Sequence, residues 1–388
     1  MKAVIAIDSF KGSLSSLEAG QAIKEGILSV ERDADVTIIP VADGGEGTTE
    51  ALTYGMGGSM QEIIVTGPLG EPVNARYGIV RHNIAVMEMS AAAGLTLVED
   101  EKRDPTITTT YGVGEMIKDA VNKGIRHFIV GIGGSATNDG GAGMLQALGY
   151  DFIDDNGNAI GFGAKGLRDL SAIKTENALP ELKECSFRIA CDVTNPLCGK
   201  NGASVIFGPQ KGATPEMAEI MDKWLLKYAE IVRKVNPDAD PQFPGAGAAG
   251  GLGFAFHSFL KGSLESGIKI VLDETGLEEY VRNADIVITG EGRLDSQTVM
   301  GKAPAGVAKL AKKYEKPVIA FSGSVASDAI ACNDHGIDAF FPVIRDIMTL
   351  DEAMDPENAK KNLTETAKQV FRLLKIWNAE PNVIYFSS

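Results

Sequence analysis

The chain has 388 residues, 44% of them apolar and 23% charged, which is typical of a packed protein of two or three domains and excludes general disorder. Its formal net charge of −15 argues against a nucleic-acid binder and against a basic membrane anchor. No segment approaches the about 20 apolar residues of a membrane helix, and the run Ala3–Ile7 is too short for a signal peptide, so we expect a cytoplasmic protein. The four cysteines lack CxxC spacing and indicate neither a zinc site nor a disulfide framework.

The first sixty residues predict alternating strands and helices. Val4–Ile7 and Val36–Pro40 are short apolar runs typical of buried strands, and Leu17–Val30 has the apolar spacing of a helix. A glycine-rich turn follows at Asp43–Gly47, and Thr48–Tyr54 begins as a helix would. This order of elements is typical of a parallel α/β sheet.

Between about residues 60 and 96 the pattern changes. Short apolar runs are separated by Gly-Pro and Gly-Glu-Pro turns, which is typical of an antiparallel meander. The runs are Glu62–Val65, Tyr77–Val80 and Ile84–Met87. Helix and strand signals return at Gly112–Lys123 and His127–Val130, and Gly212–Val235 is mostly helical. The middle of the chain therefore predicts a different sheet from the one at the N-terminus.

The C-terminal part again predicts βαβ units. The predicted strands are Asp285–Thr289, Pro317–Phe321 and Ala339–Val343, with a helix at Gly306–Tyr314. Asp355 as N-cap and Pro356 at the first helical position predict the start of the last helix. The simplest architecture is an α/β fold with one doubly wound parallel domain made from both termini, residues 1–62 and 280–388. A large mixed α/β domain, residues 63–279, would be inserted into it.

Glycine is in excess, at 45 of 388 residues or about 12%, against a usual ~7%. The glycines gather in six segments, which are Asp8–Ser13, Ala42–Thr48, Gly131–Gly143, Cys191–Gly202 with Phe207–Gly212, Pro244–Gly253 and Gly290–Gly306. Four of the six follow a predicted strand, after Ile7, Pro40, Val130 and Thr289. Ligands of open α/β sheets bind beyond the carboxyl ends of the strands, where glycine-rich loops offer backbone N–H groups to anions.

The same loops carry charged side chains of both signs. The carboxylates are Asp8, Asp43, Glu46, Asp139, Asp192, Glu291 and Asp295, and the cations are Lys11, Lys200, Lys211, Arg293 and Lys302. Phosphoryl transfer needs this mixture, because carboxylates can hold Mg²⁺ or accept a proton while cations and amides neutralise phosphate. Taken singly, each loop carboxylate is more often a cap or a turn former, and Gly131–Gly134 alone could be a tight βα connection.

Other chemistries have weaker signals. Two GxGxxG matches, Gly161–Gly166 and Gly245–Gly250, do not lie between a clear strand and a helix, so a dinucleotide site is disfavoured. Gly199-Lys200 and Gly301-Lys302 lack the rest of a Walker A loop. The four histidines lie outside the richest loops, which disfavours histidine as a catalytic base.

At these motifs the chain resembles the bacterial glycerate kinase family over essentially its whole length. The motifs are Asp8–Leu14, Ala42–Thr48, Gly133–Gly143, Cys191–Gly199, Phe207–Gly212, Pro244–Gly253, and Thr289–Asp295 with Gln297-Thr298 and Gly301-Lys302. The resemblance implies two α/β domains, one of them Rossmann-like or flavodoxin-like, with the active site in the cleft between them. It also implies ATP as co-substrate, Mg²⁺ as cofactor and D-glycerate as acceptor. The expected partners are these small molecules, with no nucleic acid and no membrane, and the chain could be a monomer or a homo-oligomer.

The chemistry of glycerate suggests roles for the substrate side of the site. Lys11 and Arg293 are predicted to hold the single carboxylate of glycerate, with Asp8 and Ser9 as further substrate-binding residues. Asp192 is the predicted acceptor of the hydroxyl proton. The alternative base is Asp295, and Lys11 is also counted among the catalytic candidates.

The remaining candidates are assigned to ATP and metal. Predicted contacts to ATP come from Gly133, Gly134, Ser135, Lys211 and Lys302. The residues predicted to bind Mg²⁺ or to position water are Asp43, Glu46 and Glu291.

The residues leave open which hydroxyl is phosphorylated and which class of function the chain has. The acceptor could be the 2- or the 3-hydroxyl, although the resemblance favours 2-phosphoglycerate as the product. A nucleotide-dependent hydroxy-acid dehydrogenase and a non-catalytic hydroxy-acid sensor are the alternative functions. The combination of carboxylates and lysines in the loops favours the kinase over both. No role is assigned to Glu380–Ser388.

Overall fold

The protein divides into two compact units in this computed structural model, which describes residues 1–378. Met1–Asp43 and Val271–Ser388 form the first, which we call the terminal unit, and Gly44–Ile270 forms the inserted unit. The expected boundaries, near residues 62 and 280, lie later in the chain. The helix α2 (Thr48–Gly55) packs on strands of the inserted unit, so the chain has already changed units before it. Glu380–Ser388 lies outside the described residues, and a catalytic cleft between domains stays a prediction.

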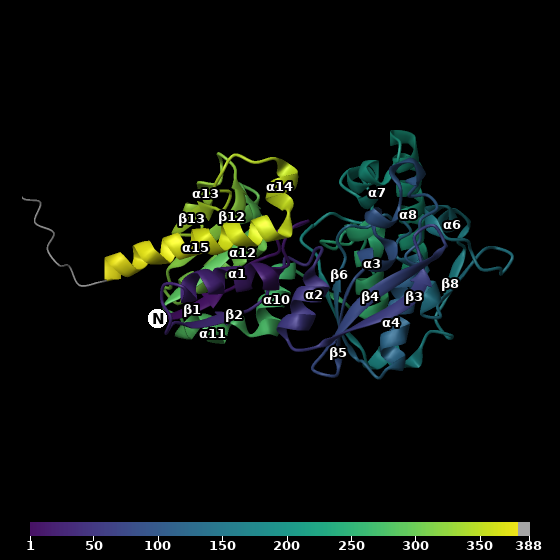
Figure 1. Ribbon diagram of the computed structural model, residues 1–388. Helices are drawn as coiled ribbons and strands as arrows, with labels where there is room; N and C mark the ends of the chain where they lie inside the picture. Colours follow the sequence, from purple (N-terminus) through teal and green to yellow (C-terminus); the bar gives the residue numbers. More distant parts are fainter. Residues whose placement is uncertain (379–388) are drawn as a thin grey trace, which may run out of the picture. The chain divides into compact units, whose positions relative to one another are not determined.

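Within the described residues, the terminal unit contains a five-stranded sheet in the order β13-β12-β11-β1-β2 (Figure 1). All neighbouring strands are parallel. The strands are β1 (Lys2–Ile5), β2 (Asp35–Ile38), β11 (Ile286–Leu294), β12 (Val318–Val325) and β13 (Ala339–Pro342). The two ends of the chain therefore build one parallel α/β sheet, and the predicted fold class is confirmed.

The terminal unit contains the helices α1 (Ser16–Leu28), α11 (Leu277–Asn283), α12 (Ala303–Lys313), α13 (Ala331–Asp334), α14 (Leu350–Met354) and α15 (Pro356–Asn378). Helix α10 (Gly267–Thr275) crosses the boundary between the two units at Val271. In Figure 1, α15 (yellow) runs along α1 (purple), and the two helices pack together. Gly26 permits this, because a Cβ there would lie 2.5 Å from the carbonyl oxygen of Thr364. The side chain of Asp355 accepts a hydrogen bond from the Asn358 amide at 3.0 Å, which confirms the predicted N-cap.

The loop predicted after Thr289 is wrong in part, because β11 continues to Leu294. The extension pairs with β12, with Glu291 opposite Ser322 and Arg293 opposite Ser324. The glycine at 290 is needed for this pairing, since a Cβ there would lie 1.9 Å from the Phe321 carbonyl oxygen. Gly290 is therefore needed because two strands approach closely at this position, and not because the chain turns there.

The inserted unit contains, within the described residues, a six-stranded mixed sheet in the order β10-β9-β6-β5-β4-β3. Its strands are β3 (Ser59–Thr66), β4 (Pro72–Val80), β5 (Ile84–Glu88), β6 (His127–Gly131), β9 (Ser186–Ala190) and β10 (Ser263–Glu265). Strands β3, β4 and β5 form the predicted antiparallel meander, and the other pairs are parallel. A separate two-stranded antiparallel sheet pairs β7 (Asp151–Ile153) with β8 (Ala172–Lys174). The predicted mixed domain is confirmed.

The helices of the inserted unit pack around a hydrophobic core that contains more residues than the core of the terminal unit. They are α2, α3 (Ser90–Ala93), α4 (Tyr111–Asn122), α5 (Ala142–Ala147), α6 (Gly163–Asp169), α7 (Ala203–Phe207), α8 (Pro215–Val235) and α9 (Leu252–Leu260). In the core, the rings of Phe128 and Phe187 stack with centroids 4.7 Å apart. The prediction that Gly212–Val235 is mostly helical is confirmed, because α8 spans Pro215–Val235. The Thr214 side chain caps its start by accepting from the Met217 amide at 3.2 Å.

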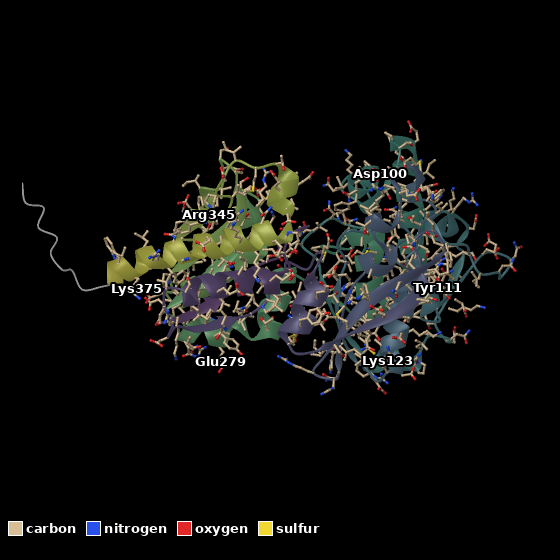
Figure 2. The ribbon with its side chains drawn as sticks, viewed as in Figure 1. Asp100, Tyr111, Lys123, Glu279, Arg345 and Lys375 are labelled. Atoms are coloured by element: carbon tan, nitrogen blue, oxygen red, sulfur yellow. The ribbon has the colours of Figure 1, made fainter. Side chains whose placement is uncertain are left out.

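Charged side chains project from the surfaces of both units, as Lys123, Glu279 and Lys375 do in Figure 2. Among residues 1–378, no helix has the length and apolar character needed to cross a membrane.

Candidate active site

The carboxyl ends of β1 and β11 open into a cavity of about 380 Å³ in the terminal unit. The predicted site residues of this unit all line it, namely Asp8, Ser9, Lys11, Asp43, Glu291, Arg293, Asp295 and Lys302. They come from three separate stretches of the chain, which parallel strands bring to one edge of the sheet. The tertiary structure therefore gathers these residues at one place.

The end of β11 places charged side chains along the cavity. Glu291 and Arg293 belong to the strand, and alternate residues of a strand point to the same side. Asp295 follows directly after the strand ends at Leu294. The Oγ of Ser322 accepts from the Leu294 amide at 3.0 Å and donates to the Ser324 carbonyl at 2.7 Å, which fixes the end of the strand against β12.

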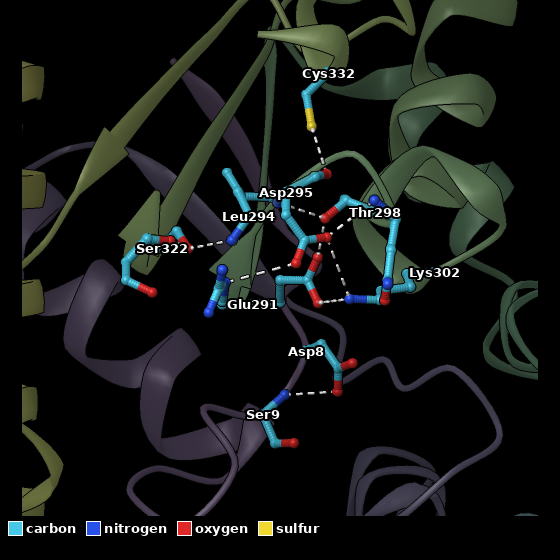
Figure 3. Close-up of polar contacts among 12 residues, drawn as sticks. Asp8, Ser9, Glu291, Leu294, Asp295, Thr298, Lys302, Ser322 and Cys332 are labelled. Atoms are coloured by element: carbon cyan, nitrogen blue, oxygen red, sulfur yellow. Dashed lines mark hydrogen bonds and ion pairs between the residues drawn. The ribbon is translucent and has the colours of Figure 1, made fainter. Parts of the chain in front are cut away.

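Glu291 is nearly buried, at 8% exposure, yet two groups contact its carboxylate. The Thr298 hydroxyl donates to Oε1 at 2.6 Å, and the Lys302 ammonium lies 3.6 Å from Oε2. Figure 3 shows these side chains pointing toward one another. Burial raises the pKa of Glu291, and the contacts with Thr298 and Lys302 oppose that rise.

Asp295 lies between the two cations of this edge. Its Oδ2 is 3.6 Å from the Arg293 Nε, and its Oδ1 is 3.9 Å from the Lys302 ammonium. The amide of Gln297 donates to the same Oδ1 at 2.9 Å. The Arg293 side chain is 68% exposed, so its guanidinium keeps donors available for an anion in the cavity.

Asp8 is the most deeply buried carboxylate of the cavity, at 3% exposure. The Ser9 amide donates to its Oδ1 at 2.7 Å, as Figure 3 shows. Burial and then the negative charge of Asp43 raise the pKa of Asp8 to about 7, while the Ser9 hydrogen bond and Lys11 oppose the rise. The cavity thus concentrates negative charge in a poorly hydrated place, an environment that favours a cation or a shared proton.

Sequence reasoning missed part of the cavity. Leu350, Met354 and Asn362 line it from α14 and α15, about sixty residues beyond β11. No local motif marks these residues as site residues, because their position depends on how the last helices pack. Thr298 could have been found from its place beside Asp295 in the recognised motif.

The inserted unit presents a second group of predicted residues at the ends of its parallel strands. Gly133 and Gly134 are exposed just after β6, and Asp192 is exposed just after the neighbouring strand β9. The Asp192 Oδ1 accepts from the Gly267 amide at 3.3 Å. Glu46 is exposed on a loop whose Gly44 packs against Ala190, at the end of β9.

Two predicted ATP contacts of this unit are buried. Ser135 is 7% exposed and Lys211 only 1%. The Lys211 ammonium donates to the Thr137 carbonyl oxygen at 2.6 Å. Burial lowers the pKa of Lys211 to about 7, opposed by the charge of Asp139. The structure therefore places Lys211 behind the glycine-rich loop and not on its open side.

Comparison with known proteins identifies the family. A model of the glycerate kinase family matches residues 3–375. The chain belongs to the glycerate kinase family.

Relatives of the glycerate kinase family match along nearly the whole chain. The "Glycerate 2-kinase" of Escherichia coli (strain K12) is 51% identical over 377 residues, covering 97% of this chain and 98% of the relative. The "Glycerate kinase" of Bacillus subtilis (strain 168) is 48% identical over the same length, with the same coverage of both chains. A crystal structure of a glycerate kinase 2 from Salmonella typhimurium LT2 superposes with a TM-score of 0.90 at 49% identity, covering 97% of this chain and 99% of that chain. Membership in a kinase family favours the kinase interpretation over the dehydrogenase and the sensor.

The carboxylates of the cavity suit magnesium in their chemistry. Among residues 1–378, no three His, Cys, Asp or Glu side chains are arranged as a complete metal site. Magnesium in phosphoryl-transfer enzymes usually has one or two carboxylate ligands and takes the rest from phosphate and water. The negative charges of Asp43 and Glu291 both raise the pKa of Asp8, and a cation beside them would relieve that repulsion.

Proposed function

We propose that this chain is an ATP-dependent glycerate kinase that transfers the γ-phosphate of ATP to a hydroxyl group of D-glycerate. The observation that carries the proposal is the cavity of the terminal unit, where eight side chains predicted from the family motifs meet. Family membership over residues 3–375 supports the same reaction. The reaction needs cations for two anionic substrates, carboxylates for metal and proton, and N–H groups for phosphate, and the two units supply all of these.

Glycerate recognition is assigned to the basic side of the cavity. Arg293 offers a fork of donors that matches a carboxylate, and Lys11 adds a second positive charge. Asp8 and Ser9 are the proposed partners of the hydroxyl groups, since they lie beside Lys11 on the same segment. A small acid with two hydroxyls would thus be held by charge at one end and by hydrogen bonds along its length.

Asp192 is the proposed acceptor of the hydroxyl proton. Its carboxylate is exposed just after β9, and the Gly267 amide donates to its Oδ1 at 3.3 Å, which orients the side chain. Asp295 remains the alternative, although Arg293 and Lys302 both lie within 4 Å of its carboxylate. Asp192 is preferred because the contacts with Arg293 and Lys302 already engage both carboxylate oxygens of Asp295.

The phosphates of ATP are assigned to Gly133, Gly134 and Lys302. Exposed glycines after a central parallel strand let a phosphate approach the backbone, and Lys302 supplies charge at the start of α12. Mg²⁺ would be held by Asp43 and Glu291, with Glu46 as a further candidate, and when bound it would neutralise charge on the phosphates. Cytoplasmic localisation and 2-phosphoglycerate as the product belong to the same proposal.

A coupled assay of ADP release tests the function directly. ADP should appear with D-glycerate and Mg²⁺ present, and release should stop when either is omitted. Phosphorus NMR of the product then distinguishes the 2-phosphate from the 3-phosphate. ADP release that does not depend on glycerate would refute the proposal, and a 3-phosphate product would refute only its regiochemistry.

A further inference from the structure

The glycine-rich segment after β6 has an open part and a closed part. Gly133 and Gly134 are exposed, whereas every residue from Ser135 to Leu145 is buried. The glycines of the closed part are needed for packing, as Gly143 shows: a Cβ there would lie 2.3 Å from the Thr109 hydroxyl. Two glycines of this motif are therefore available to a ligand, and the others build their support.

Asp139 organises the closed part from its centre. Its buried carboxylate accepts from the Thr110 amide and hydroxyl, both at 2.8 Å, from the Gly141 amide at 3.0 Å and from the Gly143 amide at 3.3 Å. Gly141 is the N-cap of α5 and Gly143 lies in its first turn, so Asp139 accepts from two of the amides at the start of this helix. These two amides are therefore not open to a ligand, whereas Gly133 and Gly134 are exposed.

Lys211 supports the segment from the opposite side. It ends a short 3₁₀ turn, Pro209–Lys211, and its ammonium donates to the Thr137 carbonyl oxygen at 2.6 Å. Burying a charged amine is costly, and the negative charge of Asp139 opposes the deprotonation of Lys211. Thr137 lies three residues from Gly134, so this contact restrains the backbone directly behind the open part.

We propose that Lys211 is a positioning residue that holds Gly133 and Gly134 in the geometry that binds the phosphates of ATP. It acts through the Thr137 carbonyl and together with Asp139, and it does not touch the nucleotide. This inference rests on the proposed function, because it takes that segment as the phosphate site. This role agrees with the burial of Lys211, which a direct contact with the nucleotide would not.

The test compares Lys211→Met with Lys227→Met. Lys227 is an exposed lysine of α8 whose ammonium also donates to a backbone carbonyl, that of Arg168 at 2.8 Å, so it controls for loss of such a contact. Titration calorimetry with ATP alone, below the unfolding temperature of each variant, should show at least roughly tenfold weaker binding in Lys211→Met. Lys227→Met should bind ATP as the wild type does, and the KM for glycerate should change less than twofold in both.

A purely structural role predicts a different outcome. In that case Lys211→Met would unfold at a lower temperature but bind ATP normally while folded, and the proposal would be overturned. Should Lys211→Met fail to fold, Thr110→Val provides the second variant, since it removes a hydroxyl that donates to Asp139 and accepts from the Met144 amide at 3.0 Å. It should weaken ATP binding selectively, and equal losses for ATP and glycerate would overturn the proposal.

The binding measurement also separates this inference from the proposed function. Wild-type protein that binds ATP but does not phosphorylate glycerate would refute the function alone. Normal ATP binding in Lys211→Met, with glycerate phosphorylation intact in the wild type, would refute the positioning role alone.

Discussion

The terminal unit buries the carboxylate of Asp8 and the inserted unit buries the ammonium of Lys211, and the two groups have different surroundings. Asp8 lines an open cavity beside Asp43 and Glu291, so its burial crowds negative charge where a ligand enters. Lys211 lies behind a glycine-rich segment with its hydrogen bond directed to a backbone carbonyl. Burial moves both pKa values to about 7 from opposite directions. Burial therefore leaves Asp8 facing a cavity in one unit and encloses Lys211 against a backbone carbonyl in the other.

The largest expected effect is on the pH dependence of stability at Lys211. The unfolded chain keeps this proton up to a pKa of about 10, whereas the folded chain loses it near 7. Stability of the wild type should therefore rise relative to Lys211→Met between about pH 7 and 10, by on the order of 4 kcal/mol. Urea unfolding of both proteins across this range measures the difference, with Lys227→Met as control. A difference independent of pH would show that Lys211 stays fully charged in the fold.

Asp8 should show the opposite dependence. A carboxyl whose pKa rises on folding contributes stability below its ordinary pKa near 4, and this contribution is lost as the pH rises through about 7. With a metal chelator present, the wild type should lose on the order of 3 kcal/mol relative to Asp8→Asn between pH 4 and 8. The exposed Asp33→Asn is the matched control. Parallel pH profiles of wild type and Asp8→Asn would contradict the crowding of charge in the cavity.

Asp192→Asn tests the inserted unit as the source of the base. Loss of a general base should reduce kcat by at least about 100-fold, while the melting temperature stays unchanged because the side chain is exposed. Steady-state kinetics with Asp238→Asn, an exposed carboxylate of the same unit, provides the control. Near-normal turnover would remove Asp192 from this role and turn attention to Asp295.

Arg293→Ala tests the terminal unit as the glycerate side of the reaction. A lost charge-assisted hydrogen bond of about 1.5–3 kcal/mol corresponds to a KM for glycerate raised roughly 10- to 100-fold. The KM for ATP should change little, and Arg345→Ala, an exposed arginine of the same unit, should leave both constants unchanged. Equal increases in the two KM values would argue against a clamp on the glycerate carboxylate.

Local patterns in the sequence determined a large part of the fold. The Gly-Pro turns and short apolar runs predicted the meander of β3, β4 and β5, and Asp355-Pro356 predicted the start of α15. The motifs also predicted eight residues that line one cavity. These features can be predicted from the sequence because turn residues, capping side chains and apolar periodicity act over a few neighbouring residues.

Contacts between distant residues decided the rest. Gly290 looked like the start of a loop, but its neighbour Phe321 on β12 makes it part of a strand. Lys211 looked like a phosphate ligand, yet its ammonium lies 2.6 Å from the carbonyl of Thr137, 74 residues earlier in the chain. Leu350 and Asn362 joined the cavity only through the packing of the last helices. Residue type and spacing therefore determined which chemical groups the loops carry, whereas burial and strand pairing, which depend on the whole fold, decided which of those groups line a cavity and which are enclosed within a unit.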